Sequence, residues 1–528
     1  MNFIPFLICF LGFCYAKVED YLKGIEFDRT FSPIEGKVID INFVMTDKQY
    51  NEMIENAQLS MVEFMSIYHG NYPDELKYST KIGLNITVGD EVYSYEKVKL
   101  KLGGNSSKFA GKIGYNLKFS GKDTFLGRNN IHLRADFNDP THMRSKLVVD
   151  LINKWNIPTI QESYANIYIN KKYHGFYFIL DAIKPGWVTS VYHLPEDEEV
   201  TTLYSCEGLK LMFNPDNVRS ICHNEKNSYA NYTEPLYDMI DEVYEYTTLE
   251  QLKSKIDNVD VMRKVFIYEY LFGMNDNFIM GGNNYNFYLK SNGKWDFIPM
   301  DYSIVFLYDF ANMLSYVKYQ IPRQETLLDY AKVSFEDWHS PDTRKPFIDI
   351  LYYKNKKEFI KTLKELLITG FNPDELFARI DELAKFIAPH VERDSTPDES
   401  GFTPGHINRK TKSLEYTMET FWNSIGSGNY EAIVGGTLFG LKKYIQTKFD
   451  AVCKIYGINK TEILLKAKIY RSKRALEVRI YDIKQEIIEL KEKLRGLSDK
   501  KKEEIQKQIN QLKNTIKSLN STIKTLKY

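Results

Sequence analysis

The sequence predicts an α+β protein whose chain ends in a pair of long helices. Through much of residues 38–183, apolar residues alternate with polar ones at period two, which is typical of strands. Between 249 and 274, and again between 347 and 456, apolar residues recur every three or four positions, as on one face of a helix. From Leu476 the same spacing continues almost to the C-terminus. The three patterns predict a strand-rich region, a helical region and a coiled-coil tail, in that order.

The chain is long enough for two or three domains. It has 528 residues, of which 43% are hydrophobic, a fraction that suits burial in a core. Lys and Arg together number 70, and so do Asp and Glu. Zero formal net charge argues against bulk affinity for nucleic acid and offers no polybasic patch for a membrane. We therefore expect no nucleic-acid partner.

Residues 1–16 have the features of a cleaved secretory signal peptide. An apolar run from Phe3 to Phe13 has signal-peptide length, and the small residue Ala16 precedes a charged segment that starts at Lys17. The alternative is an uncleaved anchor, but the run is short for a bilayer, and no later window has the ~18 apolar residues of a transmembrane helix. We expect a secreted, extracellular protein without a transmembrane segment.

The strand-rich region also contains two helical stretches. Alternation predicts strands at 38–44, 98–102 and 115–119. A helix is expected over 46–56, where Thr46 can cap the first turn, and another over 144–154. This mixed order predicts an α+β lobe.

Cysteine usage agrees with a secreted protein. Cys206 and Cys222 flank a short polar loop, and a disulfide that closes ~15 residues would stabilise the fold by about 3 kcal/mol. Cys453 is then left over, and we expect it to be a buried free thiol. No Cys or His spacing typical of a zinc site is present in the sequence.

Five Asn-x-Ser/Thr sequons predict a glycoprotein, if the chain passes through a eukaryotic secretory route. They begin at Asn85, Asn105, Asn231, Asn459 and Asn520. Asn105 lies in a Gly-Asn-Ser-Ser turn, where we expect backbone structure to take precedence over a glycan.

The segment from Asp276 to Asp301 carries the strongest functional signal. A predicted helix over 249–274 leads into the loop that contains Asp276. Alternating residues at 285–289 and 295–298 predict two strands, joined by a favoured hairpin turn at Asn292-Gly293. The segment is therefore a predicted β-hairpin preceded by an acid.

Polar side chains gather at one end of this hairpin. Asn284 begins the outgoing strand and Asp301 ends the returning one, so an antiparallel pairing places them at the same end. Carboxylate and amide oxygens are ligands that Mg²⁺ takes, and Asp276 supplies a second acid nearby. Protein kinases use the same three parts, a base Asp, an Asn and a metal-binding Asp. The alternative is an ordinary hairpin with polar ends.

The helical region and the tail differ in what they predict. Helices over roughly 347–367, 373–386, 413–424 and 430–456 have apolar stripes that are most simply core. In the tail, residues 465–528, the apolar seam changes phase at Gly496-Leu497-Ser498-Asp499, which favours two helices folded into an antiparallel hairpin. One continuous helix that forms an oligomer through a coiled-coil partner is the alternative.

Several short blocks of the sequence also follow one another in a recognisable order. They are 104–107 (Gly-Asn-Ser-Ser), 115–119, 143–147, 168–170, 173–177, Asp276, 282–285, 293–295, 297–299 and Asp301. In order and number these blocks resemble the spore coat protein H (CotH) kinase family, over roughly residues 38–455. Each block is weak alone, and the set is specific.

The resemblance implies an atypical, secreted protein-kinase-like fold with two lobes. The family domain would span residues 17–455, with a strand-rich N-lobe at about 38–190 and a helical C-lobe at about 230–455. Members of the family are expected to bind ATP and Mg²⁺ and to phosphorylate proteins.

Site residues are carried over by position. Asp276 resembles the catalytic base that accepts the hydroxyl proton. Either Asn283 or Asn284, together with Asp301, resembles the set of Mg²⁺ ligands.

The resemblance also implies residues for ATP. Lys118, on a strand after the Gly-Asn-Ser-Ser turn, would reach the phosphates, and Lys112 is the competing candidate. For either lysine, a solvated surface charge is the alternative. Asp181 stands where the family commonly has Glu, near the adenine end of the nucleotide.

Two further positions depart from the family pattern. Ser303 stands where a second acid is usual, and Gly103 where an Arg is usual. We expect a secreted protein kinase that moves the γ-phosphate of ATP to a hydroxyl of a secreted or surface protein. The alternative is a weak or inactive kinase fold that acts as a scaffold or adhesion protein through its surface and its coiled coil.

Overall fold

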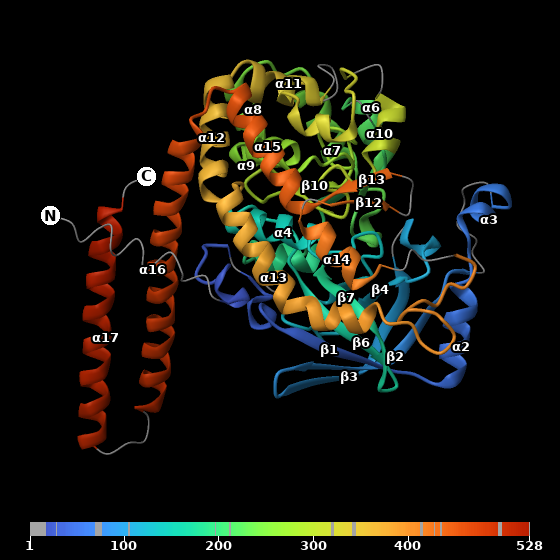
Figure 1. The fold of residues 1–528 in the computed structure, drawn as a ribbon, viewed down its shortest axis with the longest axis horizontal. Coiled ribbons are helices and arrows are strands. Elements are labelled where there is room, and N and C mark those ends of the chain that lie inside the picture. The colour runs from blue at the N-terminus through green and yellow to red at the C-terminus, as the bar shows by residue number, and fades with distance from the viewer. Residues whose placement is uncertain are drawn as a thin grey trace.

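The computed structural model confirms the α+β class. Two larger sheets and a set of helices make up the fold, with the larger sheet below most of the helices in Figure 1. The structure describes residues 17–526 except 28, 69–75, 104–105, 196, 211–212, 318–320, 340–344, 412–415, 427, 433–435 and 495–498. The predicted signal peptide and Asn105 lie outside the described residues.

Seven strands form a closed sheet. They are β1 (Val38–Val44), β2 (Ser79–Val88), β3 (Glu91–Gly103), β4 (Gly114–Lys118), β5 (Asn130–Arg134), β6 (Glu162–Ile169) and β7 (Lys172–Asp181). The order around the sheet is β1-β2-β3-β4-β5-β7-β6, and closure comes from β1, which pairs antiparallel with β2 and parallel with β6. Alternate side chains such as Ile39, Ile41 and Phe43 fill the interior.

This closed sheet differs from the kinase-like N-lobe that the resemblance implies. The strands expected over 38–190 are present, but β1 hydrogen-bonds on both edges, at Thr87 of β2 and at Asn166 of β6. The sheet therefore has no open edge, and a closed sheet of seven strands is not the arrangement of a kinase N-lobe.

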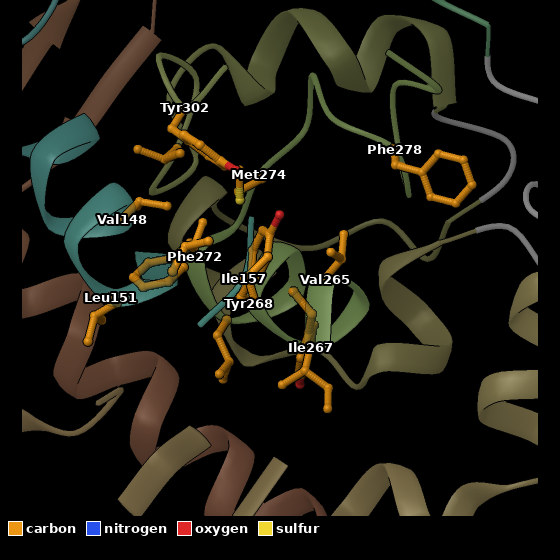
Figure 2. Close-up of a cluster of buried hydrophobic side chains, with 14 of the residues drawn as sticks. Val148, Leu151, Ile157, Val265, Ile267, Tyr268, Phe272, Met274, Phe278 and Tyr302 are labelled. Carbon is orange, nitrogen blue, oxygen red and sulfur yellow. The ribbon is translucent and has the colours of Figure 1, made fainter. Parts of the chain in front are cut away.

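The helices surround a second core. They are α2 (Asp47–Asn56), α3 (Met61–Ser66), α4 (Arg144–Lys154), α5 (Pro185–Val191), α6 (Pro215–Ile221), α7 (Glu234–Tyr244), α8 (Leu249–Lys255), α9 (Val259–Phe272), α10 (Phe310–Val317), α11 (Phe335–Trp338), α12 (Lys356–Thr369), α13 (Pro373–Asp394), α14 (Met418–Ile425), α15 (Leu441–Ile455), α16 (Lys460–Lys493) and α17 (Asp499–Thr525). Every residue of α4 and eleven of the fourteen in α9 are buried. Val148 and Leu151 of α4 belong to the same apolar cluster as Phe272 of α9 (Figure 2).

A second sheet has four strands and continues this core. It contains β8 (Leu203–Cys206), β9 (Cys222–Asn224), β10 (Tyr285–Leu289) and β11 (Trp295–Pro299), in the order β11-β10-β8-β9. A disulfide between Cys206 and Cys222 joins β8 to β9, and Cys453 is a buried free thiol. The hairpin strands β10 and β11 are thus fixed to a sheet whose far edge is covalently tied.

The helix predicted over 430–456 is wrong in its first part. Residues 429–432 and 436–439 form β12 (Asn429–Ala432) and β13 (Gly436–Phe439), and α15 begins only at Leu441. The reason is composition, because two β-branched residues and a glycine pair at 433–436 disfavour a helix there.

The two C-terminal helices pack on each other (Figure 1). Ile483, Ile487 and Leu490 of α16 bury their side chains with Ile509 of α17. The turn expected at 496–498 lies outside the described residues. Although α16 is long, none of the helices described here is apolar enough along its length to cross a membrane.

Lys448 of α15 is a buried amine that offers a test of this core. Its side chain is fully buried, its Nζ lies 3.3 Å from the centre of the Tyr270 ring, and Nζ has no hydrogen-bond partner among the described residues. Burial lowers the pKa of Lys448 well below its usual value. The folded state thus favours the neutral amine, whereas the unfolded chain prefers the charged form.

Lys448→Met is expected to raise the thermal midpoint at pH 7, by about 2–4 °C for each kcal/mol gained. Because the pKa is depressed in the folded state, the wild type gains stability as pH rises toward the unfolded value of ~10.4, so the advantage of the variant shrinks at pH 9.5. Thermal unfolding at both pH values measures this. Lys454→Met, at an exposed position of the same helix, is the control and should change neither midpoint much.

Candidate functional site

The predicted hairpin is confirmed. β10 and β11 pair antiparallel with Tyr285 opposite Pro299, and Gly293 in the turn has a φ of 79°, a conformation that favours glycine. Beyond the last pair, the N–H of Met300 donates to the carbonyl of Asn284 at 3.1 Å. The ladder therefore holds Asn284 and Asp301 at the same end of the hairpin.

Asp276 lies in the loop after α9 and faces both asparagines. The side-chain amide of Asn283 donates to Oδ1 of Asp276 at 3.1 Å. That of Asn284 donates to Oδ2 at 3.2 Å and to the Asp276 carbonyl at 2.9 Å. The carboxylate is thus oriented by two amides from the start of β10, and its position follows from the rigid helix that precedes it.

Asp301 is held by a cation that comes from the closed sheet. Its Oδ1 accepts hydrogen bonds from Nη2 of Arg134 at 3.1 Å and from the N–H of Ser303 at 3.0 Å. Burial would raise the pKa of Asp301, but Arg134 and Ser303 outweigh burial and hold the pKa below its usual range. Asn277 fixes the backbone by donating to the Asp301 carbonyl at 2.8 Å.

The pKa of Asp276 is shifted in the opposite direction from that of Asp301. Burial raises its pKa to about 6, the hydrogen bond from Asn283 opposes burial, and the negative charge of Asp301 adds to it. Asp309 also raises this pKa, which places a third carboxylate near the pair. Sequence reasoning missed Asp309, because nothing in its surroundings marks it as close to Asp276.

Three polar residues of the site have left-handed backbone. The φ angles are 60° at Asn284, 54° at Asp301 and 55° at Asp309. Asn and Asp adopt this region more readily than other side chains, yet such residues persist where the surrounding structure determines them. These three side chains therefore project from backbone whose conformation is fixed by the surrounding structure.

The two candidate lysines lie in different places. Lys112 is buried and its Nζ pairs with both carboxylate oxygens of Asp394, at 2.8 and 2.6 Å, so its charge is already balanced. Lys118 ends β4 with an exposed side chain and pairs in register with Asn130. At ~3.3 Å per residue, Asn130 is about 13 Å along β5 from Arg134, on the same outer face. The structure therefore brings neither lysine into contact with Asp301.

Asp181 is enclosed by protein groups. Its carboxylate accepts from Arg128 Nε at 3.1 Å, from the N–H of Gln161 at 2.6 Å and from Trp187 Nε1 at 3.2 Å. It is 1% exposed. Its side chain is thus bound within the fold at the end of β7.

Arg134 is a second residue of the site that sequence reasoning missed, after Asp309. In β5, Ile131 and Leu133 are buried, whereas Arg134 lies on the outer face and is partly exposed. No local signal shows that this outer face meets the end of β11, because the contact joins residues 167 positions apart.

The site supplies some of the oxygen ligands that a hard cation such as Mg²⁺ takes. Among the residues that the structure describes, no three His, Cys, Asp or Glu side chains are placed to hold a metal ion by themselves. Asp276 and Asp301 nevertheless place two carboxylates near the side chains of Asn283 and Asn284, and Mg²⁺ is usually held by one or two carboxylates plus substrate phosphates and water. The residues present therefore fit Mg²⁺ bound together with a phosphate substrate.

Comparison with known proteins gives three curated relatives. Invasin CotH3 of Rhizopus delemar is 26% identical over 384 residues, which cover 70% of this chain and 61% of that protein. Invasin CotH2 of the same organism is 24% identical over 383 residues, with the same coverage. Inner spore coat protein H of Bacillus subtilis is 32% identical over 72 residues, 14% of this chain and 20% of that protein.

The matches differ in how much of each protein they cover. The matched part of the chain spans less than two thirds of the length of either invasin. A profile of the family described as CotH kinase protein matches residues 100–418, which is more than half of the 528 residues and includes Asp276, Asn284 and Asp301. The chain belongs to the CotH kinase family.

Proposed function

We propose that this protein is an ATP-dependent protein kinase that transfers the γ-phosphate of ATP to a hydroxyl of a secreted or surface protein. The observation that carries the proposal is the arrangement of Asp276 and Asp301. These two acids lie at one end of the hairpin, and their pKa values are shifted in opposite directions. One has a raised pKa and the other is held ionised by an arginine. Pairs of carboxyls with separated pKa values are typical of sites that divide proton transfer and charge stabilisation between them.

In this proposal Asp276 accepts the proton of the attacking hydroxyl, and the amides of Asn283 and Asn284 orient its carboxylate. Asn283 uses its own side-chain oxygen to accept from the N–H of Gly208 at 2.7 Å, so Asn284 is the better metal ligand of the two. Asp301 and Asn284 would hold Mg²⁺, which when bound neutralises the charge on the phosphates. Lys118, whose amine is exposed, is preferred over the ion-paired Lys112 for the ATP phosphates.

The remaining assignments extend the same proposal. The closed sheet and the helical part together make up the family domain, which we place at residues 17–455. Residues 465–528 would form a helical hairpin, which the packing of α16 on α17 supports. The apolar N-terminus acts as a signal peptide, and the substrate is met in the secretory pathway or outside the cell.

Asp301→Ala tests the proposal. The purified mature protein is incubated with labelled ATP and Mg²⁺, and label on the protein itself or on an added protein acceptor is measured. We expect the variant to lose metal-dependent transfer, because it lacks the one carboxylate that this proposal assigns to the metal. Asp216→Ala is the control, since its side chain is 98% exposed on α6 and touches no residue of the site. Equal labelling of the wild type and Asp301→Ala would refute the assignment.

A second candidate function is a non-catalytic scaffold or adhesion protein. Ser303 favours it, because this position offers Asp301 hydrogen-bond donors where the family usually supplies another acid. The relatives are named as invasins and as a spore coat protein, which points in the same direction. Thermal unfolding with and without ATP and Mg²⁺ separates the two functions, since a nucleotide that binds the folded state raises its stability. A midpoint that does not move favours the scaffold.

A further inference from the structure

Arg134 connects the closed sheet to the candidate metal ligand. It ends β5, and its Nη2 donates to Oδ1 of Asp301 at 3.1 Å. The side chains are 24% and 36% exposed, so the pair is partly shielded from solvent. An ion pair in such a setting is less screened than one on the open surface.

Two hydrogen bonds to the Asp301 carboxylate, one from Arg134 and one from the backbone of Ser303, end on the same oxygen. Arg134 Nη2 and the N–H of Ser303 approach Oδ1, and neither uses Oδ2. The two donors thereby fix the rotation of the carboxylate about its side chain. They leave Oδ2 as the oxygen with which Asp301 can bind a cation.

Arg134 itself is restrained from its other side. Its Nη1 is buried and has no hydrogen-bond partner in the part of the chain that the structure describes, and the nearby acids Asp136 and Glu162 act on its charge. Both acids are buried, and each has one carboxylate oxygen without a partner among the described residues. Together with Asp301, these two acids hold the pKa of the Arg134 guanidinium above its usual value.

We infer that Arg134 is a positioning residue for the metal, which orients the Asp301 carboxylate so that Oδ2 faces the bound Mg²⁺. This inference rests on the proposed function. Arg134 belongs to the closed sheet, whereas the metal ligand Asp301 lies at the end of the hairpin. The closed sheet therefore helps the hairpin to bind the metal. It also supplies a cation near the phosphates, where Gly103 leaves the usual family arginine absent.

The test is a titration of Mg²⁺ into the full-length protein saturated with a non-hydrolysable ATP analogue, followed by calorimetry. Loss of a group that orients a metal ligand typically lowers metal affinity by about 10–100-fold, and we expect this for Arg134→Met. Arg134→Lys should recover part of the loss, because it restores the charge without the planar fork. In steady-state assays the Mg²⁺ concentration for half-maximal rate should rise, and kcat should recover at saturating Mg²⁺.

A buried arginine elsewhere is the matched control. Arg29 pairs with Glu35 at 2.9 Å, with both side chains buried, and contacts no residue of the site. Arg29→Met should lower stability without changing the Mg²⁺ affinity. An Arg134→Met protein that binds Mg²⁺ as tightly as the wild type, or more tightly because the arginine only competes with the metal, would overturn the inference. A wild type that binds no Mg²⁺ with the analogue would instead overturn the proposed function on which the inference depends.

Discussion

Asp276→Asn is expected to slow phosphate transfer by about 10²–10⁴-fold, the usual contribution of a positioned general base. The substitution removes the group that would accept the hydroxyl proton and changes little else in size. Its neighbours Asn283 and Asn284 each lose a carboxylate acceptor, but an amide oxygen can accept one of the two hydrogen bonds. The rate at saturating ATP measures the effect.

Nucleotide binding separates this variant from Asp301→Ala. Asp276 is assigned to proton transfer, so Asp276→Asn should keep ATP affinity within a few fold, whereas loss of Asp301 should weaken the metal-dependent part of binding. Calorimetric titration with ATP and Mg²⁺ provides the comparison. A rate within threefold of the wild type would show that Asp276 is not the base.

The hairpin could be predicted because it depends on neighbouring residues. Alternation at 285–289 and 295–298 and the turn at Asn292-Gly293 are local signals, and an antiparallel register follows from them. The same register places Asn284 and Asp301 together. This part of the site was therefore readable from sequence alone.

The closed sheet and the arginine of the site could not be predicted in the same way. Closure requires β1 to meet β6, where Asp40 and Asn166 are 126 positions apart, and period-two alternation is equally consistent with an open sheet. Likewise, Arg134 has the pattern of any solvent-facing residue at the end of a strand. The role of Arg134 depends on its contact with Asp301 at the end of the hairpin, and the residue pattern within β5 carries no information about that contact.

Charged groups in the core give a similar lesson. Under the family resemblance, Lys112 is the competing candidate to Lys118 for the ATP phosphates. In the fold Lys112 meets Asp394 of α13, 282 positions away. The sequence shows that Lys112 is charged. The partner of that charge, however, is set by packing between elements that are distant in the sequence.

The largest effect on stability is expected at a buried network of five charges. Glu35 accepts from Arg29 at 2.9 Å, from Lys146 at 3.1 Å and from Arg379 at 3.3 Å. Asp150 joins Lys146 at 2.5 Å and Arg379 at 2.7 Å. Because these residues belong to the N-terminal segment, α4 and α13, the network fixes three parts of the chain that are distant in sequence.

The pH dependence of this network follows from Glu35. Burial alone would raise its pKa, but Lys146, Arg29 and Arg379 outweigh burial and lower it from 4.5 to about 2. A carboxyl whose pKa is depressed in the folded state contributes stability above the unfolded value, and that contribution is lost as pH falls from about 4.5 to 2. At 1.36 kcal/mol per pKa unit, the contribution at pH 7 is about 3 kcal/mol.

Glu35→Gln should therefore lower the free energy of unfolding by about 3–5 kcal/mol at pH 7, because Arg29, Lys146 and Arg379 keep their burial and lose a counter-charge. At pH 3 the unfolded wild-type carboxyl is already protonated, so the difference between the two proteins should be smaller by about 2 kcal/mol. Urea unfolding at both pH values measures it, with Glu503→Gln on the exposed face of α17 as the control. An equal difference at pH 7 and pH 3 would mean that packing at Glu35, and not its charge, stabilises this junction of the chain.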